Sequence, residues 1–277
     1  MRSVAVVLAG GRAERFGKDK LVEIVDGACV LARVVRAVEG LVDAVYLAAR
    51  EAERCRFYAS VTGFVDALCL EDTGVECRGP AAPIVSAGRV TAERYLIVAG
   101  DMPWLDGRVV ERLASFHRSG ALSVLHGTGM LEPLIQVLDR ESVDRAARLS
   151  RLLCRLRGKL RPTDVLRAAP RLTLVGSGLL TDTPTSFAHA NTPVELRSYW
   201  ARNPLGEKTV VELTPPLSEL VDSLPSEVGE ARAALCRVLG REARLYASLG
   251  LRHLKVHAEG DYRVLCGGDA GAAPPDG

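Results

Sequence analysis

Hydrophobic and polar positions alternate along the first two-thirds of the chain in short blocks. Five apolar runs predict buried strands, at residues 3–8, 44–49, 65–70, 95–99 and 121–126. Four segments between them have the periodicity of helices, at residues 31–38, 51–59, 84–93 and 109–117. Strands that alternate with helices at this spacing predict parallel β-α-β units, and therefore a sheet covered by helices.

The predicted fold is α/β, with a Rossmann-like, mostly parallel sheet sandwiched by helices. Parallel sheets of this kind bind ligands beyond the carboxyl ends of their strands, near the point where the strand order reverses. The stretch LAGGRAERFGKDK, residues 8–20, directly follows the first predicted strand. We therefore expect this glycine-rich, cationic loop at the ligand-binding edge of the sheet.

The pattern changes near the C-terminus. Residues 204–207 predict a linker and 228–249 a helix. Alternating positions on both sides of a Glu-Gly-Asp turn predict a hairpin over 253–265, in which His253 and His257 face solvent rather than hold a metal. An extension of about 70 residues can hardly support its own core, so we expect it to pack on the preceding domain or on a second protomer. The predicted division is a domain, a small α+β extension and a disordered tail, at residues 1–203, 204–266 and 267–277.

The composition is that of an ordinary globular protein and argues against binding of nucleic acid or of a membrane surface. Of the 277 residues, 48% are hydrophobic and 25% are charged, and the net charge is +2. So small a net charge gives no broad field to attract nucleic acid or a membrane surface, so any cationic function has to be local. The apolar runs are too short to predict a membrane span or a secretory signal, and we expect a cytoplasmic protein.

The cysteines leave two interpretations open. None of the 7 belongs to a C-x-x-C pair, which argues against a zinc or redox motif. Buried, unbridged thiols are the simpler interpretation. Disulfides are the alternative, because the amide residues are confined to Gln136, Asn191 and Asn203, a scarcity typical of thermophiles. Hyperthermophile cytosols tolerate disulfides.

The glycine-rich loop has the composition of a phosphate-binding loop. Glycines let backbone N–H groups approach phosphate oxygens, and Lys or Arg neutralise the charge. Five residues separate Gly11 from Gly17, and an Asp follows Lys18 where the P-loop needs Ser or Thr. The adjacent glycines Gly10 and Gly11 exclude the dinucleotide-binding fingerprint.

The pattern that remains, L-A-G-G-x-x-x-R-x-G-x-D-K, resembles the nucleotidyltransferases with a glycosyltransferase-A-like fold, and most closely the molybdenum cofactor guanylyltransferase (MobA) family. The resemblance covers about residues 1–203. It implies that the nucleotide is bound by Leu8, Ala9, Gly10, Gly11 and Lys20. It also implies that Arg15 and Lys20 are the two catalytic cations.

The stretch YLIVAGDMPWL places Asp101 just beyond a predicted strand and two residues before Pro103. A carboxylate there, beside a phosphate-binding loop, is well placed for Mg²⁺, which prefers a few carboxylates together with substrate phosphates. The structural alternative is an Asp that starts a turn before proline. The resemblance implies that Asp101 is catalytic and binds both the metal and the nucleotide.

The stretch FAHANTPVEL predicts a helix that begins near Pro193 and is capped by Asn191 or Thr192. The resemblance implies in addition that Asn191 is a metal ligand beside the phosphates. His189 stands where many members carry another polar residue, so it either touches substrate or makes local hydrogen bonds.

Two further stretches match the family less closely. In LEDTGVECRGPAAPI the resemblance assigns nucleotide contacts to Asp72 and Gly79, but Pro83 replaces a usual glycine. Ala49 stands about where the family often has an Asn, so the preference for guanine rests on the resemblance alone. In GMLEPLIQVL, residues 132–134 either line the acceptor pocket or belong to an ordinary strand.

The activity implied by the resemblance is transfer of GMP from GTP to molybdopterin carrying molybdenum or tungsten, with Mg²⁺ as cofactor and pyrophosphate as product. The acceptor phosphate is already anionic, so the reaction needs positioning and charge neutralisation more than a strong base. The same chemistry could instead serve a molybdopterin cytidylyltransferase, or a guanylyltransferase of cobinamide phosphate or phospholactate.

A non-catalytic nucleotide-binding protein is an alternative of another class. The presence of Lys20 together with Asp101 argues against it. Neither nucleic acid nor a membrane is expected as a partner, whereas a homo-oligomer and a cofactor-accepting partner protein both stay open.

Overall fold

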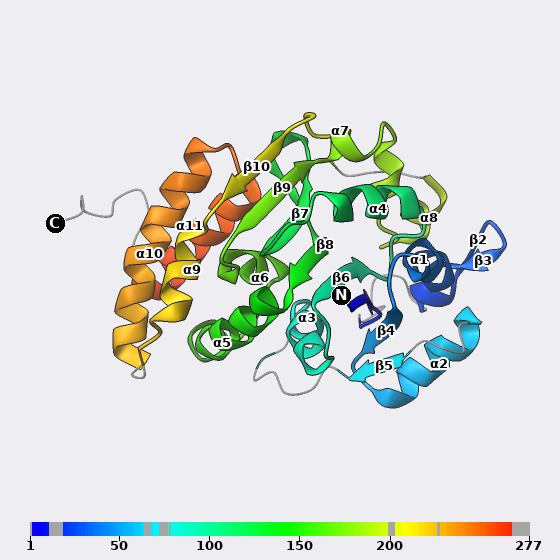
Figure 1. Ribbon diagram of the computed structural model, residues 1–277, viewed down its shortest axis with the longest axis horizontal. Coiled ribbons are helices and arrows are strands. Elements are labelled where there is room, and N and C mark those ends of the chain that lie inside the picture. Colours follow the sequence, from blue (N-terminus) through cyan, green and yellow to red (C-terminus); the bar gives the residue numbers. More distant parts are fainter. Residues whose placement is uncertain are drawn as a thin grey trace.

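The computed structural model describes residues 2–10, 19–63, 68–71, 77, 79–198, 203–225 and 228–267. Its centre is an eight-stranded sheet with the order β10-β9-β7-β8-β6-β1-β4-β5 (Figure 1). The strands are β1 (Ser3–Leu8), β4 (Ala44–Ala49), β5 (Leu68–Glu71), β6 (Arg94–Ala99), β7 (Ala121–Leu125), β8 (Leu131–Asp139), β9 (Leu172–Gly176) and β10 (Val210–Leu213). A separate small hairpin joins β2 (Ile24–Val25) and β3 (Ala28–Cys29).

The sheet is mostly parallel, which confirms the predicted fold class. Strands β5, β4, β1 and β6 run parallel to one another, as do β7 and β9. Strand β8 is antiparallel to both of its neighbours, and β10 is antiparallel to β9 at the edge. The order therefore changes at β8, between the two parallel parts of the sheet.

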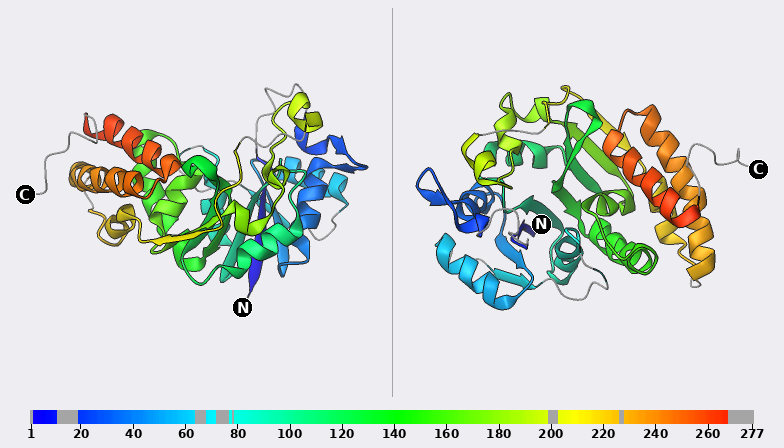
Figure 2. Two further views of the ribbon diagram at one scale, coloured as in Figure 1. Left: turned by 90° about the horizontal axis from the view of Figure 1, so that it is seen from above. Right: turned by 180° about the vertical axis from the view of Figure 1, so that it is seen from behind.

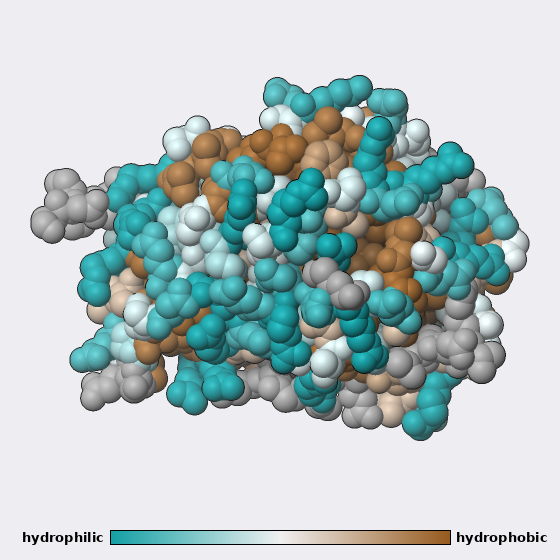
Figure 3. All heavy atoms as spheres, viewed as in Figure 1, coloured by the Kyte–Doolittle hydropathy of each residue, from teal (hydrophilic) through white to brown (hydrophobic). Residues whose placement is uncertain are grey.

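Helices cover both faces of the sheet because its strands are apolar on both sides. In β1, Val4 and Val6 belong to one buried cluster, and Ala5 and Val7 belong to the other. The second cluster contains residues of α1 (Val30–Glu39), α2 (Ala52–Thr62), α4 (Gly107–Ser115) and α7 (Ser177–Leu180). The first contains residues of α3 (Ala82–Ser86), α5 (Arg140–Arg157) and α6 (Pro162–Ala168). Outside these layers, hydrophilic side chains cover much of the face seen in Figure 3.

The carboxyl ends of β1 and β6 lie side by side, which brings the first loop next to Asp101. The two strands pair in parallel as far as Leu8 with Ala99. The backbone N–H of Gly100 then donates to the carbonyl of Leu8 at 3.0 Å. A Cβ at position 100 would come within 2.8 Å of that oxygen, so this close approach requires glycine.

Most predicted elements of the first half are confirmed, with β1 and β4 matching to the residue. The helix predicted at 84–93 is too long. Helix α3 ends at Ser86, and a 3-10 turn, η2 (Ala87–Arg89), follows it. Of the strand predicted at 65–70, residues 68–70 belong to β5, and residues 64–67 lie outside the described part of the chain.

The hairpin predicted at 253–265 is wrong, because these residues form helix α11 (Arg252–Cys266). The buried positions Leu254, Ala258, Asp261 and Leu265 recur at helical spacing along one face. The short polar-apolar alternation around Val256 does not extend far enough to outweigh them. Residues 267–277 were predicted as a disordered tail, of which the structure describes only Gly267.

The extension packs on the domain, one of the two arrangements we expect from its size. Strand β10 adds to the edge of the central sheet. Helices α9 (Pro216–Asp222), α10 (Val228–Ser248) and α11 lie at the same end of the sheet, opposite α1 and α2 (Figures 1 and 2). Their apolar residues, such as Leu235, Leu239 and Leu254, share the buried cluster of α5 and α6.

Buried charges reinforce this contact. The fully buried guanidinium of Arg167 on α6 donates to Glu242 on α10 at 2.5 Å and to Asp261 on α11 at 2.9 Å. Arg157 at the end of α5 reaches Asp261 at 2.6 Å. These pairs hold the pKa of Asp261 at about 2: burial would raise it, but the facing guanidinium groups outweigh that effect.

Of the two interpretations of the cysteines, the structure supports the alternative one, disulfides, for six of the seven. Disulfides join Cys55 to Cys69, Cys77 to Cys154 and Cys236 to Cys266, while Cys29 is free and buried. The partners are separated by 14, 77 and 30 positions, so their pairing depends on the fold and cannot be deduced from spacing. In the described part of the chain, no helix is long and apolar enough to cross a bilayer.

Candidate active site

A small cavity of about 100 Å³ lies at the carboxyl ends of β1 and β6. It brings together five residues predicted from the sequence to bind nucleotide, Leu8, Ala9, Gly10, Lys20 and Asp101. Its remaining walls are Asp19, Leu21, Pro80, Pro83, Ala99 and Leu134. The predicted residues Gly11, Arg15 and Asp72 lie outside the described residues, so their roles stay predictions.

Gly79 lies next to this cavity and has a packing role. A Cβ at this position would come within 2.2 Å of the carbonyl oxygen of Leu160. Glycine therefore lets the segment before α3 approach the chain that follows α5. Two residues earlier in the sequence, Cys77 is bridged to Cys154 of α5. The wall that carries Pro80 and Pro83 is thus fastened to α5.

Lys20 is held in place by its neighbour Asp19. The carboxylate of Asp19 accepts a hydrogen bond from the backbone N–H of Leu21 and caps the 3-10 turn η1 (Lys20–Val22). It also accepts hydrogen bonds from Arg54 at 3.0 Å and from the Tyr58 hydroxyl at 2.8 Å. Asp19 therefore fixes the start of η1 against α2, and this contact directs Lys20 towards the cavity.

Three predicted residues from distant parts of the chain meet at one point. The ammonium of Lys20 lies 2.5 Å from the carboxylate of Asp101 and 2.9 Å from the amide oxygen of Asn191. Asp101 comes from the loop after β6, and Asn191 precedes α8 (Pro193–Ser198). These three residues are far apart in the sequence, and the structure shows that the fold brings them together.

The predicted helix cap explains how Asn191 is oriented. The Thr192 hydroxyl accepts from the backbone N–H of Glu195 at 3.1 Å, and the backbone N–H of Asn191 donates to the Glu195 carboxylate at 2.9 Å. The backbone N–H of Ala190 donates to the carbonyl of Asp101 at 2.8 Å. Both ends of this short segment are therefore fixed, and the side chain of Asn191 faces Lys20.

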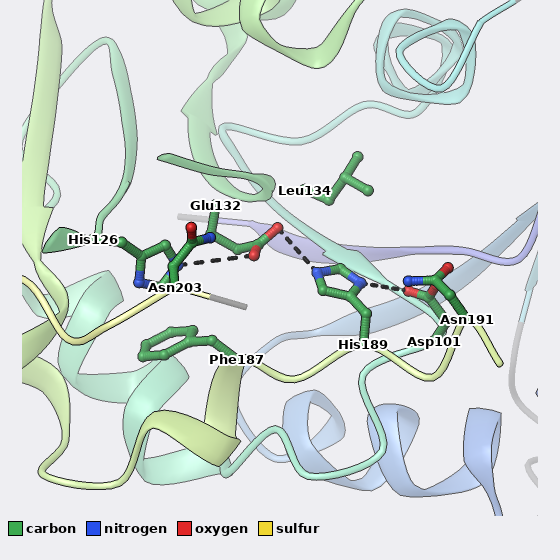
Figure 4. A pocket seen from close by; sticks show the side chains of 8 residues that line it. All are labelled: Asp101, His126, Glu132, Leu134, Phe187, His189, Asn191 and Asn203. Atoms are coloured by element: carbon green, nitrogen blue, oxygen red, sulfur yellow. Dashed lines mark hydrogen bonds and ion pairs between the residues drawn. The ribbon is translucent and has the colours of Figure 1, made fainter. Parts of the chain in front are cut away.

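A second cavity, of about 280 Å³, lies on the other side of Asp101 (Figure 4). Its walls are Asp101, His126, Glu132, Leu134, Phe187, His189, Asn191 and Asn203. Asp101 and Leu134 also line the first cavity, so they separate the two spaces. Glu132 and Leu134 stand two positions apart on β8 and so face the same side of the sheet, and both line this cavity, whereas Pro133 does not. That the cavity receives the acceptor stays a prediction.

A chain of charged groups crosses the second cavity, as Figure 4 shows. His189 Nδ1 lies 3.0 Å from Asp101 Oδ1, and His189 Nε2 lies 3.2 Å from Glu132 Oε1. The other oxygen of Glu132 faces His126 Nε2 at 3.8 Å. His126 Nδ1 lies 3.3 Å from the hydroxyl of Ser177. Asp101 is therefore connected through His189 to a carboxylate that lies deep in the second cavity.

The charges in this chain stabilise one another. Burial lowers the pKa of His189, but Glu132 and Asp101 outweigh it and hold that pKa well above its usual value. Burial raises the pKa of Asp101, yet His189 and Lys20 keep it well below the ordinary range. For Glu132, burial is outweighed by His189 and His126, which lower the pKa to about 2. At neutral pH the site contains two carboxylates, an imidazolium and an ammonium.

The residues around the carboxylate of Asp101, between the two cavities, fit a hard divalent cation. Asp101 and Asn191 direct oxygen atoms to a common point, where Lys20 now supplies the positive charge. Among the described residues, no cluster of three His, Cys, Asp or Glu side chains could hold a metal by itself. A site with one carboxylate and one amide oxygen suits Mg²⁺, which takes its remaining ligands from water and substrate phosphates.

Comparison with known proteins decides the family. Residues 5–170, more than half of the chain, match the MobA-like NTP transferase domain. The chain belongs to this family. The matched region, called the MobA-like domain below, contains the first loop, Asp101 and Glu132, and it is a nucleotidyltransferase domain.

Two relatives and one solved structure illustrate the similarity. A probable molybdenum cofactor guanylyltransferase of Natronomonas pharaonis is 30% identical over 143 residues, which are 51% of this chain and 70% of that protein. The bifunctional protein GlmU of Bifidobacterium longum is 33% identical over 123 residues, 42% of this chain and 26% of that protein. Molybdopterin-guanine dinucleotide biosynthesis protein A from Archaeoglobus fulgidus shares the fold, with a TM-score of 0.50, 20% identity, and coverage of 71% of this chain and 96% of that chain.

Several residues of the second cavity were not predicted from the sequence. His126 belonged to a predicted strand, Phe187 opens the stretch FAHANTPVEL but was given no role, and Asn203 belonged to no motif. His189 was predicted either to touch substrate or to bond locally, and it does bond locally, to Asp101 and Glu132. The sequence signal that could have found Asn203 is its rarity, because it is one of three amide residues in the chain (with Gln136 and Asn191).

Proposed function

We propose that this protein transfers GMP from GTP to the phosphate of molybdopterin, with release of pyrophosphate, to form a guanine dinucleotide cofactor. The observation that carries the proposal is the position of Lys20, Asp101 and Asn191 between two cavities. The smaller cavity, beside the glycine-rich loop, is the place for the nucleotide phosphates. The larger one offers polar groups to an acceptor. The similarity to a probable molybdenum cofactor guanylyltransferase supports the choice of acceptor.

In the proposed reaction an oxygen of the acceptor phosphate attacks the α-phosphorus of GTP. A new P–O bond forms there, and the bond between the α-phosphorus and the bridging oxygen to the β-phosphate breaks. Pyrophosphate leaves with the electron pair of that bond. Since the attacking oxygen is already anionic, no general base has to remove a proton. The chain has to hold the two phosphates in line and reduce their repulsion.

Lys20 and Asp101 divide this work. When GTP binds, the ammonium of Lys20 can move from Asp101 to the phosphates, where it stabilises the charge that develops on pyrophosphate. Asp101 and Asn191 then have free oxygens that would hold Mg²⁺, and bound Mg²⁺ would supply further neutralisation of the phosphate oxygens. His189 keeps its hydrogen bond to the second oxygen of Asp101, so the carboxylate stays oriented.

The nucleotide base is the point on which the alternatives differ. The wall formed by Pro80 and Pro83 lies beside the glycine-rich loop. It offers apolar surface to a base, and Pro83 replaces the glycine that the family usually has. A panel of the four nucleoside triphosphates with Mg²⁺ in thermal-shift measurements tests the base. We expect GTP to raise the melting temperature most, and a larger shift with CTP would favour cytidylyl transfer.

The acceptor is tested by pyrophosphate release. With Mg·GTP present, molybdopterin should give turnover, whereas cobinamide phosphate and phospholactate should not. Binding of GTP without release of pyrophosphate from any of the three acceptors would instead support a non-catalytic nucleotide-binding protein.

A further inference from the structure

The second cavity is completed by residues outside the MobA-like domain. The family match ends at residue 170, and Asn203, which lines the cavity, stands directly before the extension. The segment after Asn203 was predicted as a linker, yet it is bonded to the domain. The N–H of Gly127 donates to the carbonyl of Pro204 at 3.0 Å, and the N–H of Gly178 donates to the carbonyl of Gly206 at 3.2 Å.

This segment reaches the charged groups of the cavity through one serine. The backbone N–H of Gly206 donates to the Ser177 hydroxyl at 2.6 Å, and the same oxygen lies 3.3 Å from Nδ1 of His126. The other nitrogen of His126 faces Glu132. A Cβ at position 206 would come within 2.4 Å of the carbonyl of Leu125, so only glycine allows the segment to lie this close to β7.

Helix α11 contacts the residue that precedes Glu132. The backbone N–H of Leu131, the residue before Glu132, donates to Nδ1 of His253 at 3.3 Å. His253 packs against His257, whose Nδ1 lies 2.6 Å from the Thr163 hydroxyl at the start of α6. Both histidines are therefore half-buried at the contact with the domain, which corrects the prediction that they face solvent.

We infer that Asn203, together with two contacts of the extension, Gly206 with Ser177 and His253 with Leu131, shapes the acceptor side of this cavity, while the described walls of the nucleotide-side cavity come from the MobA-like domain. The inference rests on the proposed function. The acceptor suited to the cavity carries an anionic phosphate, directed to Asp101, on a body with hydrogen-bonding groups. That body meets the amide of Asn203, the Glu132–His126 pair and the flat apolar side of Phe187. His253 acts on the acceptor through Leu131 and Glu132 and is a positioning residue.

Point variants of the full chain test this better than truncation, because the extension shares its core with the domain. We would measure the Kd of Mg·GTP by calorimetry and kcat and KM for molybdopterin by pyrophosphate release. Asn203→Ala should raise the acceptor KM about tenfold, the cost of one good hydrogen bond, and leave the GTP Kd within about twofold. His253→Ala should raise the acceptor KM severalfold with little change in kcat.

Val256→Ala is the matched control, since this side chain lies on α11 with 49% exposure, and both constants should stay at their wild-type values. The inference is overturned if Asn203→Ala leaves the acceptor KM unchanged, or if the GTP Kd rises in step with it. If His253→Ala does not fold, Asn203→Ala decides alone. A wild-type protein that binds Mg·GTP but releases no pyrophosphate with molybdopterin overturns the proposed function and this inference together. An unchanged KM in Asn203→Ala, with active wild-type protein, overturns the inference alone.

Discussion

The two cavities beside Asp101 are built in different ways. The nucleotide-side cavity takes most of its described walls from two strand ends and the segments that directly follow them, all within the MobA-like domain. The larger cavity on the other side draws Glu132 from β8, His189 and Asn191 from the approach to α8, and Asn203 from the position directly before the extension. Chemistry common to a family can thus be encoded by a short local motif. The larger cavity, which we propose receives the acceptor, depends on contacts between distant segments.

The largest expected effect comes from Asp101, which belongs to both cavities. Asp101→Asn keeps the size of the side chain but removes the charge that faces Lys20 and the expected metal. We expect kcat with Mg·GTP to fall at least about 10³-fold, since a bound metal supplies several kcal/mol of charge stabilisation. Pyrophosphate release measures this, and circular dichroism checks the fold. Turnover near the wild-type rate in folded protein would remove Asp101 from the mechanism.

Replacing Lys20 should have a smaller effect than replacing Asp101, because Lys20 lines only the nucleotide-side cavity. Lys20→Ala removes the ammonium that stabilises the leaving pyrophosphate, so kcat should fall roughly 10²–10³-fold and by more than KM for GTP rises. Steady-state kinetics at varied GTP separates the two constants. The control is Lys208→Ala, because the Lys208 side chain is 72% exposed and pairs only loosely with Asp182. A change confined to KM would assign Lys20 to substrate binding alone.

The disulfide between Cys77 and Cys154 provides a test of the nucleotide-side wall. Cys154→Ser should lower the free energy of unfolding by about 2–4 kcal/mol, and because Pro80 and Pro83 lose their link to α5, the Kd of GTP should rise severalfold. Cys236→Ser, which opens the bridge within the extension, should lower stability without changing the GTP Kd. Denaturant unfolding and calorimetry provide the two measurements. Equal GTP affinities in both variants would mean that the bridge does not fix this wall.

The smallest expected effect is on the pH dependence of stability, through His257 at the contact between the extension and the domain. Burial, followed by the charges of Arg161 and His253, lowers the pKa of His257 from 6.5 to about 3. Below pH 6.5 the unfolded chain therefore binds a proton that the folded chain does not accept until about pH 3. Stability from this group is complete above pH 6.5 and declines as the pH falls towards 3.

The variant His257→Gln should flatten the pH dependence of the free energy of unfolding between pH 6.5 and 5, where the carboxylates of the site are still ionised. The difference in slope cannot exceed about 1.4 kcal/mol per pH unit, because a single imidazole binds at most one proton. Solvent screening of the partly exposed ring should make it smaller. Urea unfolding at several pH values measures it. Identical slopes in wild type and variant would show that His257 does not titrate in this way.

Sequence reasoning worked where a local rule decides the structure. Strands β1 and β4 are apolar runs with clear ends. The motif around Lys20 and the strand-end position of Asp101 correctly predicted that these two residues meet at one edge of the sheet. It failed where the partner is distant. The contacts of Glu132 with His126 and His189 cannot be predicted from the sequence, because they form only when β7, β8 and the approach to α8 come together in the fold. Helix α11 was misread because a short alternation around Val256 resembles a strand, whereas its buried face spans the whole segment.

The buried charges between the domain and the extension also constrain how this protein can evolve. Arg167 needs both Glu242 and Asp261, and Asp261 is shared with Arg157. Asp164 also faces both arginines, and Arg161 also faces Asp261. Replacing one member therefore leaves the others with fewer buried opposite charges, which destabilises the fold. We expect a natural substitution at this contact to be compensated by a second change nearby. Helices α10 and α11 could be transplanted onto a related domain only if that domain already carried arginines at the ends of the helices equivalent to α5 and α6.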